Sequence, residues 1–394
     1  MKQHLINGRA IDIQLPDWNK VVRFKADAVY SRAPGEYYWA GYNADGSTFH
    51  LTRTTEGGML GTIWDAPTRG YYGLDVLSPE TAILIKYLPS YLPVVDGCGA
   101  EEEESESPAL PPSGSCAPTH SEIRVLFVFS PATAARLGTF GAAALASRVI
   151  GELNGASVGS GLTPAQVSFT LAGVSGLAAF TEDPCSSKTK KALLSNQEVK
   201  SLREIFFADI VCLIINDVHL QNPPCDASGN AVNNASADEA YCFAEITAAT
   251  TQFKATHGIG HVLGLGHQRC LNCWNIRCFA SIGNGDAHGF RINAGFRTIM
   301  ADCDGTTRVP RWSAVGMPFA GSPTGDADND NARKVGERAN AVSCFRADPP
   351  PPPVVVTILG TSTICGGGTR TYTVESNTGN VSQAAWTMKT DITL

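Results

Sequence analysis

Three histidines in one short segment constrain the fold of this chain more than any other feature. The segment is HGIGHVLGLGH, residues 257–267, and the histidines are His257, His261 and His267. On a helix, His257 and His261 lie one turn apart on the same face, so both imidazoles can reach one ion. Gly264 can adopt a positive φ, end the helix and turn the chain back. His267 could then supply a third ligand.

Three histidine ligands leave one position of a tetrahedron open, which is the arrangement of a catalytic zinc ion rather than a structural one. The spacing therefore predicts one bound Zn²⁺. The alternative is a glycine-rich loop with incidental histidines. The chain has only 8 histidines, and finding three of them at this spacing favours the metal site.

Composition and charge exclude other classes of protein. The chain has 394 residues, enough for two or three domains, and 43% of them are hydrophobic. Its net charge of −7 argues against nucleic acid as the main partner, because binding phosphates requires a basic surface. No apolar run approaches the roughly 20 residues that span a bilayer. We therefore expect a globular protein with no transmembrane segment.

The cysteine content indicates an oxidising compartment. The chain has 12 cysteines, an even number, dispersed along its length, which is typical of several disulfides in a secreted protein. The first residues, MKQHLINGRAIDIQLP, contain no apolar segment, so no signal peptide is visible. We expect a secreted protein whose start lies upstream, or a fragment of a longer chain.

Changes of composition divide the chain into five parts. Residues 1–97 alternate apolar and polar residues between turn sequences, which predicts a β-rich domain. Residues 98–118 are acidic and rich in Pro and Ser, which is typical of an exposed linker. Residues 119–346 alternate strand and helix patterns, which predicts an α/β domain. A polyproline linker, 347–353, precedes residues 354–394, which are too few to complete the β-sandwich that they begin.

Strands and helices are expected to alternate within residues 119–346. The expected order is a strand in SEIRVLFVFS, a helix over 132–154, a strand in AQVSFTLAGV, a helix over 186–207, a strand in DIVCLII and a helix over 250–263 that ends near Gly264.

The histidine motif resembles that of a known enzyme family. The pattern H-x-x-x-H-x-x-G-x-x-H is similar to the zinc-binding motif of the metzincin metalloproteases. FRTIMADCDG, residues 296–305, resembles their Met-turn, with Met300 as the methionine beneath the zinc. IRVLFVFSPATAARLG, RVPRWS and GSPTGDADNDNARKVGERANAVSCFR resemble parts of bacterial reprolysin-like enzymes of the peptidyl-Asp metalloendopeptidase type. GEYYWAGYNADGSTFHLT resembles their β-rich propeptide, so the resemblance covers about residues 20–346.

This resemblance implies a secreted zinc metalloendopeptidase that acts on a protein or peptide substrate. It implies an α/β (α+β) metzincin-type catalytic domain, a propeptide-like domain before it and the start of an Ig-like β-sandwich after it. It also implies that His257, His261 and His267 hold one Zn²⁺, which activates water for hydrolysis of a peptide bond.

Position 258 departs from the family pattern. The family carries glutamate directly after the first histidine, and this glutamate takes a proton from the attacking water and passes it to the leaving amine. Gly258 has no side chain. General acid–base catalysis is worth roughly 10²–10⁴-fold, so we expect strongly reduced activity. The alternatives are a non-catalytic zinc-containing module that binds proteins, and a degenerate fragment with neither function.

Two more positions differ from the family. Asp302 stands where relatives usually carry tyrosine, and it could ligate zinc, act as a substitute general base or serve as a turn residue. We favour the turn residue, because ADCDG is a typical turn sequence. Gln268 stands where relatives often carry aspartate, which affects support of the ligands more than ligation itself. Of the other histidines, we expect His288 to lie in a loop or at the surface.

Several cysteines near these motifs have two interpretations. Cys270, Cys273 and Cys278 follow His267 closely and could form a second metal site, but disulfides fit a chain of many cysteines better. Cys98 could block the zinc as a switch thiol. A disulfide between Cys98 and Cys116 is the better interpretation, because the two are close in sequence.

Overall fold

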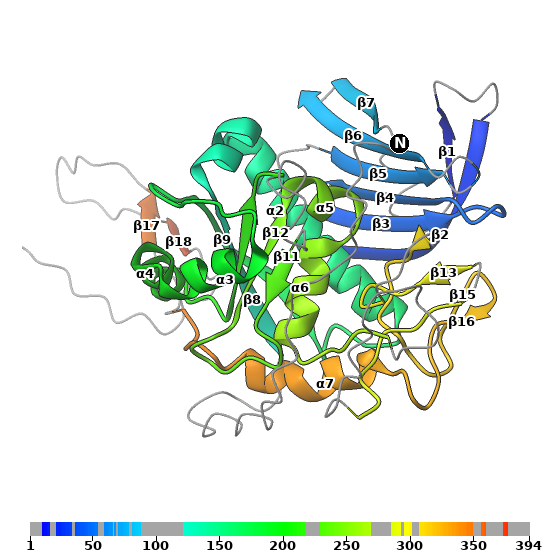
Figure 1. The fold of residues 1–394 in the computed structure, drawn as a ribbon. Coiled ribbons are helices and arrows are strands. Elements are labelled where there is room, and N and C mark those ends of the chain that lie inside the picture. The colour runs from blue at the N-terminus through cyan, green and yellow to red at the C-terminus, as the bar shows by residue number, and fades with distance from the viewer. Residues whose placement is uncertain are drawn as a thin grey trace, which may run out of the picture. The chain divides into compact units, whose positions relative to one another are not determined.

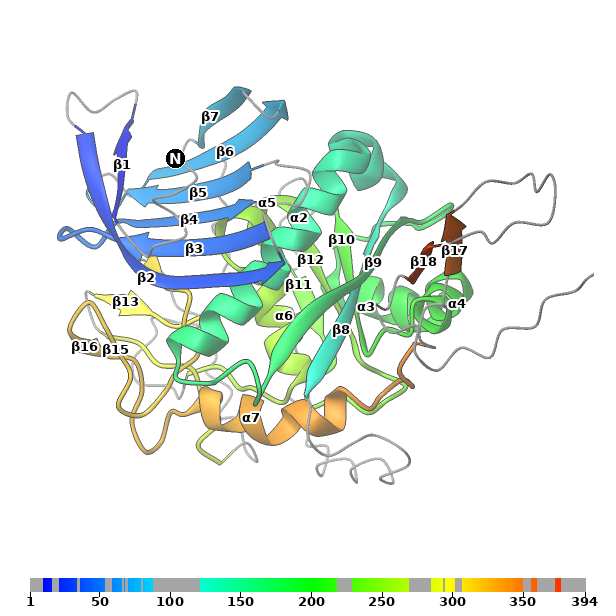
Figure 2. The same ribbon diagram turned by 180° about the vertical axis from the view of Figure 1, so that it is seen from behind.

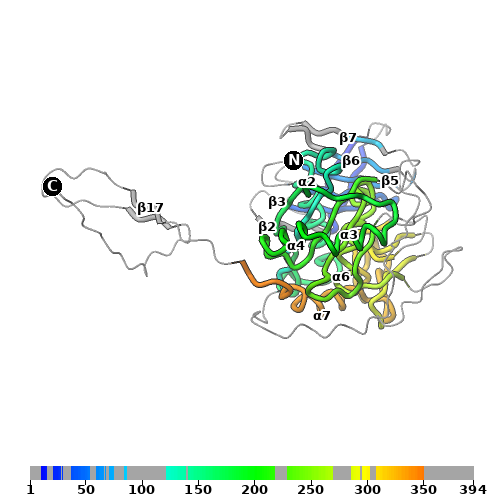
Figure 3. Tube along the Cα trace, turned by 60° about the vertical axis from the view of Figure 1, so that its left-hand side comes forward, coloured from blue at the N-terminus to red at the C-terminus, as the bar shows by residue number. Residues whose placement is uncertain are grey.

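The structure of the chain is a computed structural model, and it divides into two compact units, Met1–Ala347 and Asp348–Leu394. Figure 3 shows the Cα trace with the described part of the first unit in colour. The described residues are 10–15, 21–33, 36–53, 59–65, 67, 70–78, 81–87, 121–217, 229–268, 285–292, 295–301, 307–349, 356–359 and 373–376.

An antiparallel sheet of seven strands forms the N-terminal part of the first unit, and each strand pairs with the next along the chain (Figure 1). The strands are β1 (Ile11–Gln14), β2 (Val21–Ala33), β3 (Glu36–Tyr42), β4 (Thr48–Arg53), β5 (Met59–Asp65), β6 (Gly70–Ser78) and β7 (Thr81–Tyr87). Large apolar side chains from neighbouring strands, among them Phe24, Trp39, Phe49 and Ile63, form one buried core. The alternating sequence of these strands produces that core, because successive side chains point to opposite faces of a sheet.

A second sheet of five strands lies in the centre of the first unit, in the order β11-β12-β10-β8-β9. Four strands are parallel: β8 (Glu122–Phe129), β9 (Ser168–Gly176), β10 (Ile210–Ile215) and β12 (Tyr241–Glu245). The edge strand β11 (Gly229–Ala231) runs antiparallel to β12. Strands β8 and β10 are apolar along almost their whole length because parallel strands are buried on both faces. The prediction of a mixed α/β arrangement is confirmed.

Six helices occur in the described part of the first unit. They are α2 (Pro131–Gly159), α3 (Ser186–Ser195), α4 (Gln197–Ile205), α5 (Ile246–Thr251), α6 (Lys254–Val262) and α7 (Asn331–Val342). The single helix expected over 186–207 is wrong, because Asn196 ends α3 and its side chain accepts a hydrogen bond from Val199 N, which caps α4. The single helix expected over 250–263 is also wrong. Phe253 has a φ of 55° and separates α5 from α6.

Short strands complete the described fold. In the first unit, β13 (Phe296–Arg297) pairs with β14 (Thr307–Arg308), and β15 (Pro318–Phe319) pairs with β16 (Ser322–Pro323). In the second unit, β17 (Val356–Leu359) pairs antiparallel with β18 (Thr373–Ser376). A single antiparallel pair occurs in a β-sandwich and in many other β folds. The β-sandwich therefore stays a prediction.

Helix α2 packs against both sheets and joins them (Figure 2). Polar side chains of the N-terminal sheet also contact the region around α6. Thr62 Oγ1 donates to the carbonyl of Thr250 at 3.2 Å, and the ring of His50 lies edge-on to Phe253 with 5.0 Å between centroids. Arg311 pairs with Asp27 of β2 at 2.5 Å. The N-terminal sheet therefore contacts the chain at the start of the helix that carries His257 and His261.

Candidate metal centre

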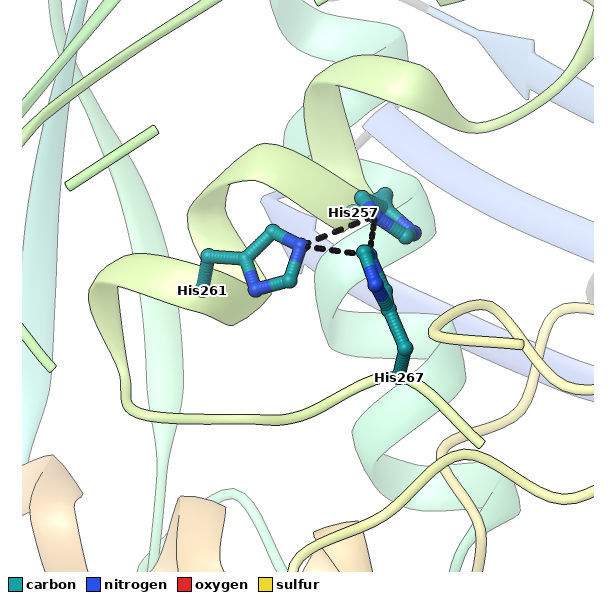
Figure 4. A group of neighbouring side chains, drawn as sticks. All are labelled: His257, His261 and His267. Carbon is teal, nitrogen blue, oxygen red and sulfur yellow. Dashed lines mark hydrogen bonds between the residues drawn. The ribbon is translucent and has the colours of Figure 1, made fainter. Parts of the chain in front are cut away.

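The three histidines of the opening motif converge on one point (Figure 4). His257 and His261 extend from α6, and His267 extends from the chain that follows the helix. Their Nε2 atoms are 3.0 Å apart for His257 and His261, 3.0 Å for His261 and His267, and 3.1 Å for His257 and His267. His257 and His261 are buried, and His267 is partly exposed. This cluster could hold a metal ion.

The other ring nitrogens determine which atoms face the cluster. His257 Nδ1 lies 2.8 Å from the carbonyl oxygen of Ile299, and His261 Nδ1 lies 2.9 Å from that of Leu265. A carbonyl oxygen only accepts hydrogen bonds, so each Nδ1 must carry the proton. In the neutral ring, Nε2 then presents a lone pair to the cluster. Metal-binding histidines in proteins are oriented in the same way, by a second hydrogen bond to a carbonyl or carboxylate.

The donor set fits a zinc ion. The lone pairs of His257 and His261 face one another at 3.0 Å and repel, and a cation between them removes that repulsion. Zinc binds imidazole nitrogen at about 2.0–2.1 Å with tetrahedral angles, which places two such nitrogens about 3.3 Å apart. The observed separations are slightly shorter than this value. Small rotations of the rings would therefore be enough to admit the ion.

A sharp turn brings His267 back to the helix. Gly264 has a φ of 84°, which favours glycine, and its N–H donates to the carbonyl of His261 at 2.8 Å. Leu265 N donates to the carbonyl of Gly260 at 3.0 Å. These two bonds satisfy carbonyls in the last turn of α6 and end the helix. The turn also directs the Leu265 carbonyl to His261, so it orients one ligand while it delivers the next.

Met300 lies directly against α6. It is fully buried, and a Cβ atom at Gly260 would lie 2.5 Å from its sulfur. Glycine at 260 is thus required by packing, although glycine in a helix costs about 1 kcal/mol relative to alanine. The preceding residue, Ile299, supplies the carbonyl that holds His257. The turn around Met300 therefore both packs beneath the helix and orients a ligand.

Gly258 faces the central sheet. A Cβ atom at this position would lie 3.1 Å from Cys242 Cβ and 3.5 Å from Cys242 Sγ, on β12. The side chain of a glutamate at position 258 would therefore begin at a tightly packed position beside β12. As the chain stands, position 258 supplies no proton acceptor to the cluster.

A buried ion pair on α2 supports α6 from the other side. Arg148 Nε donates to Glu152 at 2.8 Å, and Thr256 Oγ1 donates to the second carboxylate oxygen of Glu152 at 2.8 Å. Burial raises the pKa of the Glu152 carboxyl, although Arg148 and Thr256 lower it. Thr256 directly precedes His257, so this network fixes the helix next to the first ligand.

The structure describes only some of the predicted site residues. Asp302, Cys98 and the three cysteines after the motif, Cys270, Cys273 and Cys278, lie outside the described residues. His288 was expected in a loop or at the surface. It lies outside the helices and strands, but only 1% of its surface is exposed, and its Nδ1 lies 2.9 Å from the carbonyl of His267. No signal in the sequence marks His288, because its role depends on chain segments that meet only in the folded protein.

No helix in the described part of the chain is both long and apolar enough to cross a membrane. No family model and no curated protein matches the chain. Among solved structures, the chain is similar to one described as a chaperone–substrate complex, with 20% identity and a TM-score of 0.45. That match covers 58% of this chain and 36% of the other, so this chain spans about a third of its length.

The chain is also similar to metalloproteinase-II from Bacteroides fragilis, with 11% identity and a TM-score of 0.34. This match covers 66% of the chain and 82% of the metalloproteinase. At these scores, neither neighbour assigns a role to any residue of this chain.

Proposed function

We propose that the chain is a zinc metalloendopeptidase of the metzincin type, reprolysin-like, whose activity is strongly reduced by glycine at position 258. The observation that carries this proposal is the convergence of three Nε2 atoms within 3.1 Å of one another. Two of these imidazoles are oriented by backbone carbonyls that fix their tautomer. Such a donor set suits a cation, and three protein ligands would leave one position of a tetrahedron for a fourth ligand.

His257, His261 and His267 would hold the ion. When bound, zinc supplies a Lewis acid that polarises a peptide carbonyl and makes water a better nucleophile. The chain itself must then move the proton from the nucleophile to the leaving amine. Gly258 stands where the metzincin pattern has the glutamate that does this, and a glycine cannot accept a proton. We therefore expect peptide hydrolysis reduced by roughly 10²–10⁴-fold relative to a complete site.

The proposed domain boundaries are those predicted from the sequence. Residues 1–97 form a propeptide-like domain, 98–118 a linker, 119–346 the peptidase domain, 347–353 a second linker and 354–394 part of an Ig-like sandwich. We propose that the protein is secreted and disulfide-bonded. The disulfide bonds of Cys185 and Cys344 support an oxidising compartment.

The second candidate function is a non-catalytic zinc-containing module that binds proteins. The same glycine favours it, because the ligand frame is complete while the proton acceptor is absent. In this case the ion would hold α6, the following turn and the Met300 turn together. If Asp302 acts as a substitute base, the peptidase is favoured over the non-catalytic module.

The experiment uses the full chain and a casein-type substrate. Wild type, Gly258→Glu and Gly258→Gln are purified, and the zinc content of each is measured beside its hydrolysis rate. The proposal predicts zinc in all three, little activity in wild type and Gly258→Gln, and a clear gain in Gly258→Glu alone. Gln matches Glu in size but accepts no proton, so it separates the chemistry from the packing.

Each other outcome has a distinct meaning. An active wild type contradicts the missing-base account, and Asp302→Ala then tests whether that carboxylate replaces it. Zinc without activity in all three variants favours the binding module. A chain that binds no zinc contradicts both candidate functions.

A further inference from the structure

Of the three histidines in the cluster, only His267 lies outside α6. It follows the end of the helix, and residues 269–284 after it lie outside the described part of the chain. Its position therefore depends on contacts made by its own short segment. Among the described residues, segment 286–289 supplies several of those contacts.

Two backbone hydrogen bonds join the two segments. Gly266 N donates to the carbonyl of Ala287 at 2.8 Å, and Gly289 N donates to the carbonyl of Gly266 at 3.0 Å. Between them, His288 Nδ1 lies 2.9 Å from the carbonyl oxygen of His267. Because that oxygen only accepts, Nδ1 must donate. A buried imidazole thus supplies a hydrogen bond to the backbone of the third ligand itself.

The segment that carries His288 is fixed on its other side. A Cβ atom at Gly289 would lie 2.6 Å from the backbone nitrogen of Ala301, so the segment packs directly on the turn that contains Met300. Ser313 Oγ donates to the carbonyl of His288 at 2.5 Å, and it accepts from Asn331 N, at the start of α7, at 3.0 Å. The support of His267 is therefore tied to α7 and to the Met300 turn.

A salt bridge adds a second tie to α7. Arg333 Nε donates to Asp286 Oδ2 at 2.8 Å, and Asp330 N donates to the carbonyl of Asp286 at 2.6 Å. His288 is thus held between a rigid helix and the turn that also orients His257. This is the arrangement expected of a side chain that orients a metal ligand from behind.

We propose that His288 is a positioning residue, which holds His267 in the cluster by donating a hydrogen bond from Nδ1 to the His267 carbonyl. The inference rests on the proposed metal site but does not require peptidase activity. Hydrogen bonds behind metal ligands are worth roughly 10–100-fold in metal affinity. Loss of this one should therefore weaken metal binding while the other two ligands remain in place.

The test uses Co²⁺ in the full chain, because the visible absorption of cobalt reports the number and kind of its ligands. His288→Asn and His288→Gln are compared with wild type and with His267→Ala. Asn places an amide N–H on the same carbon as Nδ1, whereas Gln places it one carbon further out. The proposal predicts a wild-type spectrum for His288→Asn. For His288→Gln it predicts a spectrum shifted toward that of His267→Ala, and release of Co²⁺ to a chelator that is faster by roughly 10–100-fold.

Three results would overturn the proposal. The first is a wild-type spectrum and release rate in His288→Gln. The second is equal weakening in Asn and Gln, which would mean that the imidazole matters for packing only. The third is a wild-type chain that takes up no cobalt, and this result also removes the metal site, whereas the first two leave it intact.

Discussion

The Cβ position of Gly258 lies 3.1 Å from the Cβ atom of Cys242, so the residue beside the first metal ligand is packed against the central sheet. This distance is shorter than an ordinary van der Waals contact. It makes the site sensitive to any side chain at position 258, including the glutamate that would complete a peptidase.

The first prediction concerns this contact. Gly258→Ala should destabilise the wild-type chain, because overpacking typically costs about 1–3 kcal/mol. In a Cys242→Gly background the same change should stabilise, because alanine improves a helix by about 1 kcal/mol and the clash is gone. A double-mutant cycle of unfolding free energies measures the coupling. Additive effects of the two substitutions would show that the contact is not tight.

A second prediction concerns Gly260 and Met300. Gly260→Ala would place a Cβ atom 2.5 Å from the sulfur of Met300 and push on the turn that orients His257. We expect a loss of about 1–3 kcal/mol in unfolding free energy and faster zinc release. Gly336→Ala, in α7, is the matched control, because its Cβ would meet Leu162 at an ordinary 3.4 Å. Equal losses of unfolding free energy in the two variants would contradict the claim that packing against Met300 requires glycine at position 260.

A third prediction concerns the pH dependence of stability. His50 is buried between the N-terminal sheet and Phe253, and Tyr38 Oη lies 2.8 Å from its Nδ1. Burial, with Arg148 and Arg311 nearby, lowers the pKa of His50 from 6.5 to about 3. The folded state therefore keeps the ring neutral, while the unfolded chain binds a proton below about pH 6.5. The His50 contribution to stability is lost as pH falls from about 6.5 towards 3.

The size of this effect follows from the pKa difference. Between pH 7 and pH 5 the loss from His50 alone should be about 2 kcal/mol, since one pKa unit is worth about 1.4 kcal/mol. Burial raises the pKa values of Glu152 and Asp27, and it raises that of Asp209 to about 6, so these groups give the opposite trend. Comparison with His50→Gln isolates the histidine contribution. If wild type and His50→Gln lose stability in parallel from pH 7 to 5, the ring is not held neutral.

The sequence was informative where spacing alone determines geometry. Two histidines one helical turn apart, and a glycine that takes a φ of 84°, already indicate in the sequence that three imidazoles can meet. The strands around residues 122–129 and 210–215 were equally predictable, because largely apolar runs are typical of buried parallel strands.

Features that depend on distant contacts could not be predicted. Phe253 interrupts the expected helix with a φ of 55° that favours glycine, and its ring packs against His50, about 200 residues earlier in the sequence. The acceptors of His257 and His261 are backbone carbonyls, which carry no sequence signature. The burial of His288 was not expected for the same reason, because its partner is a carbonyl on another segment. Tertiary contacts, rather than local preference, decide each of these cases.

The zinc content of the full chain tests the central claim most directly. After dialysis against zinc-free buffer, elemental analysis of the wild type should give about one zinc per chain, as a three-histidine site predicts. His261→Ala, which removes a buried ligand and leaves the rest of α6 unchanged, should retain little. A wild type without zinc, or equal zinc in both proteins, would contradict the account.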